Sequence, residues 1–501
     1  MPLDPRTPVL VGVGQWSNRV DRGEPVVEPA DLLAGALRRA GADSGAPGDG
    51  EALLRGADAI RTICAFSARY RNPAALVAER LGASPRDLAV SPIGGNEPQV
   101  LVNRACLDIA AGDADIVLIG GSEAWRSRSA ARAGGTANPW TVQGDDVEPA
   151  RATGPEAELN HPAELARGIA LPTEVYPLFE QALRASLGRT IDEHLPAVGA
   201  LWAGFSEVAA ANPHAWIQAA RTADEIVTAT PDNRWVTWPY TKVMCANNAV
   251  EQGAGLILCS AARAEALGVP RDRWVFPLAA TEAHDTYAVS HRLDLHSSPA
   301  VRLAGRRLFA EAGRDIDDVA HVDLYSCFPS AVQIAARELG LAPDRQLTVT
   351  GGLSFAGGPW NNYVTHSVAT MAGVLRDDPG TLGLVTANGG FVTKHALGLY
   401  STTPPAGPGV GFRWAEVQDE VDALGARGLC ESHDGAATVE SWVVSYGREG
   451  APEKATASCL LDDGRRAWAT STDASVVSEL RTGGEQIGRT VKLTPDGDLL
   501  L

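Results

Sequence analysis

The 501-residue sequence has no block of Lys or Arg, and its 61 acidic residues outnumber its 43 basic residues. The formal net charge at pH 7 is −18. Surfaces that bind nucleic acid or anionic membranes need clustered positive charge. The composition therefore excludes nucleic acid from the expected partners, and the acidity is expected to help keep the protein in solution.

Long hydrophobic runs are also absent. No apolar stretch approaches the roughly 20 residues that a membrane-spanning helix needs. The opening, MPLDPRTPVLVGVG, lacks the basic stretch, apolar core and cleavage site of a secretory signal. We therefore expect a cytoplasmic protein without a membrane span.

Cysteine pairs are missing as well, because the seven cysteines are scattered singly and form no CxxC motif. This spacing argues against a disulfide framework and against a structural zinc site. We accordingly predict no metal site and no covalently bound cofactor. The cysteines are Cys64, Cys106, Cys245, Cys259, Cys327, Cys430 and Cys459.

Short β-branched runs alternate with Ala- and Leu-rich helical patterns through most of the chain, which predicts a layered α/β fold with buried strands. Two stretches follow one plan of helix, strand and helix, and each then reaches a Gly-Gly turn, at Gly94-Gly95 and Gly357-Gly358. Such self-similarity indicates an internal duplication with two α/β halves packed together. The clearest predicted strands are Val9–Val13, Ile116–Ile119, Leu256–Cys259, Val322–Tyr325 and Leu382–Thr386.

A long insertion, residues 125–244, separates the two halves. It contains one clear amphipathic helix pattern, TEVYPLFEQALRASLG, and no strand series. Long excursions on a rigid scaffold often cover a binding site. We place the first half at 1–124, continued by about 245–270, and the second half at 271–403.

A Pro/Gly linker, Ser401–Gly409, precedes a change of pattern. Short strands with turn signals and one helix, SVVSEL, follow it. This pattern predicts a small β-rich domain that resembles an oligonucleotide-binding barrel, so residues 404–501 comprise the linker and this domain.

The stretch SPIGGNEPQVLVNRACLDIAAG predicts a helix with Asn96 as its N-cap, Pro98 in its first turn and Gly112 at its end. Cys106 shares a helix face with Val102 and Ile109, so we expect it in the core. The reactive position of such a helix is its N-terminus, where the dipole lowers a thiol's pKa. That position is Gly95.

Several motifs in one order resemble the thiolase superfamily, the acetyl-CoA acetyltransferases. They are the VLVGVG opening, IAAGDADIVLIGGSEA, the duplicated halves, the intervening loop region and GGLSFAGGP. PYTKVMCANN, NGGFVTKHALGLYST and the extra C-terminal β domain resemble, more narrowly, the thiolase-like proteins of type 1. The resemblance implies a duplicated five-layer αβαβα body with an inserted loop domain and a C-terminal β domain.

In thiolases four motifs supply a nucleophilic cysteine, an oxyanion-hole Asn or His, an activating His and an acid/base cysteine. Aligning those motifs places Gly95, Tyr325, Gly358 and Thr386 at the four positions. Acyl transfer needs its nucleophile, base and oxyanion donors together. Two glycines and a threonine supply no thiolate and no base near neutral pH, so we do not expect ordinary thiolase catalysis.

The resemblance also implies CoA or an acyl-CoA as ligand, with a role in lipid or acyl-CoA metabolism. Residues expected near this ligand are Asn96, Asn248, Gly390, Lys394 and His395. Cys327 and His366 could form a displaced Cys/His pair, although a structural role for Cys327 is favoured. The nearby His284, His291 and His296 match no zinc-site spacing.

Two other functions remain open at this stage. The first is acyl transfer to or from an unusual CoA thioester through Tyr325, Lys394 and His395. The second is a non-enzymatic scaffold that binds a protein partner through residues 411–501. The sequence does not decide between a monomer and a homodimer.

Overall fold

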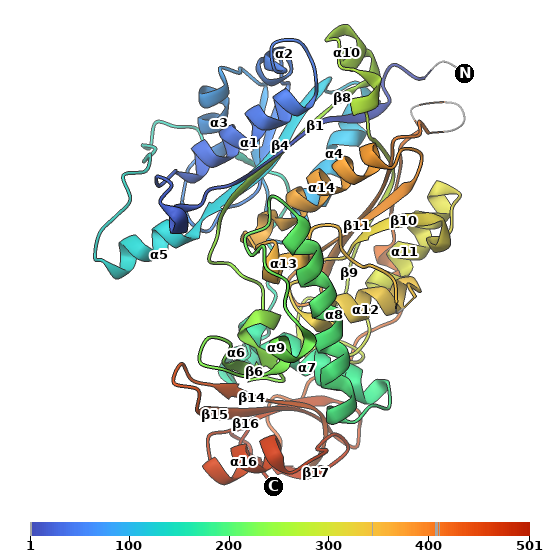
Figure 1. The fold of residues 1–501 in the computed structure, drawn as a ribbon. Helices are drawn as coiled ribbons and strands as arrows, with labels where there is room; N and C mark the ends of the chain where they lie inside the picture. Colours follow the sequence, from blue (N-terminus) through green and yellow to red (C-terminus); the bar gives the residue numbers. More distant parts are fainter. Residues whose placement is uncertain (1–2, 343, 406–408, 410) are drawn as a thin grey trace.

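Two mixed β-sheets form the centre of the body of the protein (Figure 1). The computed structural model describes residues 3–342, 344–405, 409 and 411–501. Residues 406–408 of the predicted Pro/Gly linker lie outside the described residues. The first sheet has the order β1 (Pro8–Ser17), β8 (Glu251–Ser260), β4 (Ile116–Ala124), β2 (Ala59–Thr62), β3 (Asp87–Val90) and β5 (Arg151–Ala152). The second has the order β10 (Val319–Asp323), β11 (Leu382–Gly389), β12 (Lys394–Ser401), β9 (Phe276–His284) and β13 (Arg413–Glu416).

The predicted duplication is visible in these strand orders. In the first sheet β1 and β4 run antiparallel to β8, and β2 runs parallel to β4. In the second sheet β9 and β11 run antiparallel to β12, and β10 runs parallel to β11. The two halves therefore repeat one four-stranded plan, and the predicted α/β fold is confirmed.

Helices complete five layers around the two sheets. The inner layer consists of α4 (Glu97–Ala111) and α14 (Tyr363–Asp377), which contact each other and both sheets. The outer layers are α1 (Pro29–Asp43) with α3 (Pro73–Leu81) on the first sheet, and α11 (Pro299–Ala312) with α12 (Pro329–Leu339) on the second. Short helices α2 (Glu51–Arg55), α10 (Ala261–Ala266) and α13 (Gly352–Phe355) lie in connections.

The glycines of VGVG have a packing function. A Cβ atom on Gly12 or Gly14 would overlap the backbone of α1 at Ala36 or Ala40. Glycine therefore lets β1 and α1 approach closely, and this requirement accounts for both glycines.

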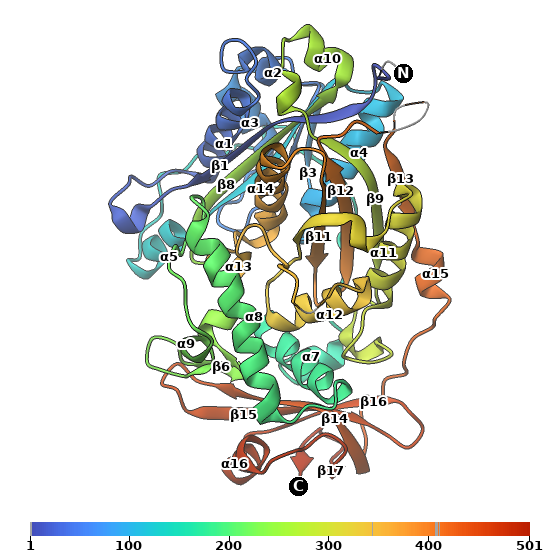
Figure 2. The same cartoon turned by 45° about the vertical axis from the view of Figure 1, so that its right-hand side comes forward.

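The insertion is mainly helical, with α5 (Trp125–Ala133), α6 (Pro162–Ala166), α7 (Pro172–Ser186), α8 (Ile191–Ala211) and α9 (Ala223–Val227). The predicted amphipathic helix is α7, whereas α8, the longest of these helices, was not predicted. Two short strands, β6 (Trp235–Trp238) and β7 (Tyr240–Thr241), follow. Figure 2 shows α7 and α8 between the body and the C-terminal strands.

The C-terminal strands form an antiparallel sheet with the order β16 (Arg466–Ser471), β15 (Pro452–Leu460), β14 (Gly435–Tyr446), β17 (Thr490–Leu493) and β18 (Leu499–Leu500). A single bridge between Thr470 and Asp498 returns the last strand toward β16. Helix α16 (Ala474–Thr482) packs on β14 and β15. The narrower assignment to an oligonucleotide-binding type of barrel stays a prediction.

Two strands pair with a sheet that is formed mainly by another part of the chain. β6, from the insertion, pairs with β14 at Trp238 and Val444, and Trp238 stacks on Trp442 with ring centroids 4.8 Å apart. β13, which follows the predicted linker, pairs with β9 of the second half, and α15 (Gln418–Asp422) packs beside it. The predicted domain boundaries stay a prediction. Within the described residues, no helix has the length and apolar composition of a membrane span.

Arg466 joins the C-terminal sheet to the body. Its side chain is 0% exposed, and Nε and Nη2 each donate to a carboxylate oxygen of Glu440 at 2.7 Å. Nη1 donates to the carbonyl oxygens of Val289, Ser290 and Arg292 in the loop around η4 (Val289–His291). A buried guanidinium bonded in this way has its charge compensated and its donors satisfied.

We predict that Arg466→Met lowers the free energy of unfolding by about 3–5 kcal/mol, because the Glu440 carboxylate and three carbonyl groups lose their donor. The neighbouring Arg465 is the matched control. It pairs with Asp463 on the surface, so Arg465→Met should lower the stability far less than Arg466→Met does. Chemical denaturation followed by tryptophan fluorescence measures both values. Equal stabilities of the two variants would contradict the role assigned to Arg466.

Candidate functional site

The N-terminus of α4 meets the ends of β10 and β11, and this contact brings three of the four predicted catalytic positions together. Tyr325 follows β10 by two residues, and its backbone N–H donates to Oγ1 of Thr386 on β11 at 2.9 Å. A Cβ atom on Gly95 would overlap the Tyr325 hydroxyl and would lie 2.5 Å from the carbonyl oxygen of Asn388. The space beside Gly95, the predicted position of the nucleophile, is therefore filled by a phenol.

The environment of Tyr325 keeps this phenol neutral. The ring is 9% exposed and meets Tyr363 edge to face, with centroids 5.6 Å apart. Burial, together with the nearby Cys327 and Tyr363, raises the pKa of Tyr325 well above its usual value. A cavity of about 20 Å³ remains beside it, lined also by Thr386 and His395. Such a volume holds about one water molecule and no acyl group.

The fourth position, Gly358, lies at a loop that closes over the same region. Its N–H donates to the carbonyl oxygen of Asn247 at 2.9 Å, and a Cβ atom on it would lie 3.0 Å from Oδ1 of Asn248. Three residues later, Oδ1 of Asn361 accepts from the N–H of Gly94 at 3.1 Å. Asn248 thus occupies the space next to the position of the family's activating histidine.

Gln252 holds this loop in place. Its side-chain amide donates to the carbonyl oxygen of Ala356 at 2.9 Å and to Oγ of Ser17 at 3.1 Å. A Cβ atom on Gly357, which has φ of +114°, would overlap the Gln252 amide. Gln252 therefore has a structural contact with the loop that carries Gly358.

Asn96 marks the start of α4 as predicted, but the predicted capping hydrogen bond is wrong. Asn96 already has helical dihedral angles, φ −75° and ψ −24°, and its side chain makes no cap hydrogen bond. A capping side chain needs an extended backbone to reach back to the helix amides. Nδ2 of Asn96 donates instead to Oε1 of Glu97 at 2.9 Å, and its Oδ1 is buried without a partner among the described residues.

Glu97 and Lys394 form a titratable pair beside Gly94 and Gly95. Nζ of Lys394 donates to the carbonyl oxygen of Ile93 at 2.5 Å. Burial raises the pKa of Glu97 to about 7, although Lys394 opposes the shift. Burial also lowers the pKa of Lys394, against the attraction of Glu97 and Glu156. Lys394 therefore faces the predicted site, and Glu97 is a residue that sequence reasoning missed.

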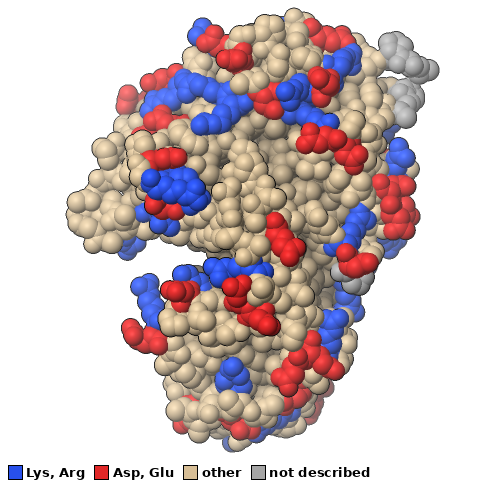
Figure 3. All heavy atoms as spheres, in the orientation of Figure 1, with Lys and Arg blue, Asp and Glu red and all other residues tan. Residues whose placement is uncertain are grey.

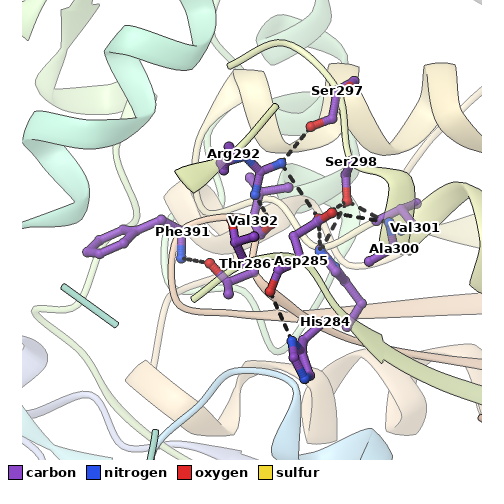
Figure 4. Close-up of polar contacts among 12 residues, drawn as sticks. His284, Asp285, Thr286, Arg292, Ser297, Ser298, Ala300, Val301, Phe391 and Val392 are labelled. Carbon is purple, nitrogen blue, oxygen red and sulfur yellow. Dashed lines mark hydrogen bonds and ion pairs between the residues drawn. The ribbon is translucent and has the colours of Figure 1, made fainter. Parts of the chain in front are cut away.

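His395 lies on the other side of β12 from Lys394, because adjacent residues of a strand face opposite sides, and it lines the small cavity beside Tyr325. It is 5% exposed, and its Nε2 lies 3.5 Å from Oδ2 of Asp285 and 3.4 Å from Oγ of Ser298. Figure 4 shows Asp285 between Ser298, which donates to it at 2.5 Å, and Arg292 at 3.6 Å. Burial opposes the shift, but Arg292 and His395 hold the pKa of Asp285 below its usual value.

The insertion covers the second-half side of the site. The Tyr176 hydroxyl of α7 donates to the carbonyl oxygen of Gly390 at 3.0 Å, and the ring stacks on Phe328 with centroids 4.5 Å apart. Leu159 of the insertion also lies against Gly390, 3.1 Å from the position that its Cβ would take. Gly390 is thus packed under the insertion. The Tyr176 contact joins positions 214 residues apart, which no local pattern indicates.

The remaining cysteine and histidine candidates each contact a different part of the protein and do not form a common site among the described residues. Cys106 is 0% exposed and packs in the central core, as predicted, and burial raises its pKa. His366 bonds to Gln15 at 2.8 Å, burial lowers its pKa to about 3, and no hydrogen bond joins it to Cys327 within the described residues. His284, His291 and His296 contact Asp285, Arg427 and Asp294, respectively.

A hollow opens on the face of the molecule shown in Figure 3, between the part that carries α5 and the part that carries α9 and β6. Lys and Arg side chains lie along its lower rim, with Asp and Glu side chains beside them. Arg126 of α5 donates to the carbonyl oxygen of Ala249 at 3.4 Å, next to Asn248. The backbone N–H of Trp216 donates to the carbonyl oxygen of Ala356 at 2.9 Å, and the Arg19 guanidinium lies over the Trp216 ring. Cationic and aromatic groups therefore surround the loop that carries Asn248.

Comparisons with known proteins agree with this geometry. The family described as thiolase-like protein type 1 additional C-terminal domain matches residues 416–498. An acetyl-CoA acetyltransferase of Methanocaldococcus jannaschii is 24% identical over 269 residues, which are 53% of this chain and 60% of that protein. A 17-hydroxy-3-oxo-4-pregnene-20-carboxyl-CoA lyase of Mycobacterium tuberculosis is 27% identical over 49% of this chain and 59% of its own length. The chain thus spans about three fifths of these curated relatives.

The whole chain is matched by a solved structure. It is a monomeric SCP2-thiolase-like protein type 1 from Mycobacterium smegmatis, with 33% identity, a TM-score of 0.84 and coverage of 100% of both chains. This match includes the duplicated body, the insertion and the C-terminal domain. The chain therefore belongs to the thiolase-like proteins of type 1, within the thiolase superfamily.

Proposed function

We propose that the protein binds CoA or a CoA thioester in the hollow near Asn248 and does not carry out the thiolase reaction. The observation that carries this proposal is the Tyr325 hydroxyl in the space beside Gly95. A ligand can reach the Asn248 loop, but its thioester carbon would meet a neutral phenol where a thiolate is required. We place this role in lipid or acyl-CoA metabolism in the cytoplasm.

The curated relatives support the ligand class, because the names of both contain CoA or acetyl-CoA. The positive charges on the rim of the hollow suit the phosphates of CoA, since Lys and Arg bind phosphate through charge-assisted hydrogen bonds. Of the five residues expected near the ligand, we propose Asn248 and Lys394 as contacts and Asn96 as a polar neighbour. We propose His395 and Gly390 as positioning residues, because both are packed against protein groups.

Acyl transfer by an unusual mechanism is the alternative, favoured by the activity in the name of the M. jannaschii relative. It requires a nucleophile or a base, and Lys394 and Glu97 are the titratable groups nearest to Gly95. A covalent acyl-enzyme detected by mass spectrometry would favour this alternative. An interaction role for residues 411–501 stays a further prediction.

We predict that CoA raises the midpoint of thermal unfolding, because a ligand that binds only the native state stabilises it by about 2.7 kcal/mol at a concentration of 100 Kd. A simple thiol without the nucleotide, at the same concentration, is the control and should produce no shift. The protein should also fail to cleave acetoacetyl-CoA with CoA above the uncatalysed rate. Cleavage at an enzyme-like rate would sink the proposal.

We predict that Gly95→Ala lowers the free energy of unfolding by about 1–3 kcal/mol, because its methyl group overlaps Tyr325 and overpacks the site. The Gly95 backbone has no positive φ, so the expected loss of stability comes from steric overlap and not from backbone strain. Gly373 in α14 is the matched control, since nothing lies within 4 Å of its Cβ position. Gly373→Ala should raise stability by about 0.5–1 kcal/mol. Combining Gly95→Ala with Tyr325→Phe should recover part of the loss, and strict additivity would contradict the contact.

The raised pKa of Glu97, about 7, predicts a loss of stability as the pH rises. The folded state favours the neutral carboxyl group, so its contribution is present at low pH and is lost as pH rises through about 7. The substituted side chain in the Glu97→Gln variant stays neutral. The free energy of unfolding of this variant should therefore fall less between pH 5 and 8 than that of the native protein, by up to about 3 kcal/mol. The exposed Glu158→Gln is the control. Parallel pH profiles for all three proteins would refute the shift.

A further inference from the structure

A second cavity, of about 330 Å³, lies between the loop after β2 and the segment that follows α5. Its size is at the lower end of the range of about 300–1,000 Å³ that small-molecule sites occupy. Arg69 and Tyr70 come from the first wall, Arg128 and Arg132 from α5, and Trp140 from the outer wall. None of the described lining residues is acidic. In a chain with a net charge of −18, three arginines without a lining carboxylate form an unusual local positive field.

Two of the three arginines are free to bind a ligand. Within the described residues, the side chains of Arg69 and Arg132 have no ion pair and no hydrogen bond, and both are exposed to the cavity's solvent side. Arg128 donates to the carbonyl oxygen of Phe66 and lies over the Trp125 ring, 5.1 Å from its centroid. The guanidinium of Arg128 is therefore fixed, while the other two can adjust to a bound group.

The acidic residues around the cavity already have partners on its outer side. Glu28 accepts from the Thr141 N–H at 2.7 Å, and Asp31 pairs with Arg80 at 2.9 Å. Glu123 accepts from the N–H groups of Phe66 and Ser67 at 2.7 Å each, behind the wall. Asp145 pairs with Arg71 at 3.1 Å. These four carboxylates are therefore engaged by other groups, and none of them is among the described residues that line the cavity.

The outer wall is held in position by hydrogen bonds. Gln143 and Asn72 exchange two of them, at 2.8 and 3.0 Å, and Arg80 donates to Oγ1 of Thr141 at 3.2 Å. The indole N–H of Trp140 is a buried donor without an acceptor among the described residues. A buried donor on a fixed wall can be satisfied by a ligand that carries hydrogen-bond acceptors, and such donors are typical of binding sites.

We propose that this cavity, which we call the arginine cavity (Ser67–Tyr70, Arg128–Arg132 and Thr136–Val142), binds a phosphate-bearing ligand of nucleotide size. Arginine forks match phosphate oxygens in geometry as well as charge, and Tyr70 and Trp140 offer aromatic surface for a planar base. Two sources of the same chemistry exist: a free nucleotide, or the nucleotide end of CoA. The proposal does not depend on CoA binding near Asn248.

Isothermal titration calorimetry of the full chain tests this proposal, with adenosine 3′,5′-bisphosphate as the probe and adenosine as the uncharged comparison. The bisphosphate should bind saturably and adenosine should not. Arg69→Gln combined with Arg132→Gln should weaken bisphosphate binding by at least about tenfold, because two charge-assisted contacts are lost. Arg189→Gln combined with Arg448→Gln removes the same charge from exposed positions elsewhere and should leave the affinity within about twofold.

Titrating CoA into the same variants separates the two sources. A parallel loss of CoA affinity assigns the cavity to the nucleotide end of CoA, whereas unchanged CoA affinity assigns it to a separate nucleotide; either result upholds the site. The proposal is overturned by no saturable bisphosphate binding, or by equal affinities of the cavity variant and the control variant. The thermal midpoint of each variant verifies folding, and single Arg132→Gln replaces the double variant if the latter unfolds.

Discussion

The close approach of Gly95 to Tyr325 is the constraint on which the centre of this protein depends. One residue begins the central helix of the first half, and the other follows a strand of the second half. Because the phenol fills the space beside Gly95, the two halves interlock at this point. The burial that accompanies this packing also raises the pKa of Tyr325, so the phenol at this contact stays neutral.

Buried charge organises the other end of the molecule. Arg466 bonds to Glu440 within the C-terminal sheet and to carbonyl groups of the loop around η4, while the Ser290 hydroxyl in that loop donates to Glu164 of α6 at 2.6 Å. The C-terminal sheet, the body and the insertion thus meet at one set of polar contacts. Since an unpaired buried charge is costly, these three parts hold each other in a single arrangement.

Local patterns predicted much of the fold. The alternation of strands and helices, the duplication, the buried face of Cys106 and the C-terminal strands all depend on short-range periodicity, and the structure agrees with them. The four predicted catalytic positions came from the motifs of the thiolase resemblance and not from periodicity. What occupies the space at those positions could not be predicted, because the contact between Gly95 and Tyr325 joins residues 230 positions apart in the chain.

The errors have similar causes. Asn96 has the right position but helical dihedral angles, so its side chain bonds to Glu97 and not to the helix amides. Lys394 and His395 are neighbours in sequence, yet Lys394 bonds to Ile93 while His395 lies against Asp285 and Ser298 on the other side of the strand. The arginine cavity was not foreseen, because its walls come from a loop after β2 and a segment after α5 that carry no shared motif. Register and side-chain direction, which long-range packing decides, are the missing information.

The pairing of β6 with β14 has a consequence for the order in which the chain acquires its structure during synthesis. Residues 235–238 leave the ribosome about 200 residues before the strand that completes their sheet, and until then Trp238 lacks the ring of Trp442 that covers it. The strand β6 of the insertion therefore lacks its partner strand until the whole second half has been synthesised. A nascent chain of this kind exposes an aromatic edge for longer than a chain whose domains fold in sequence, and chaperone contact during translation is expected at this edge.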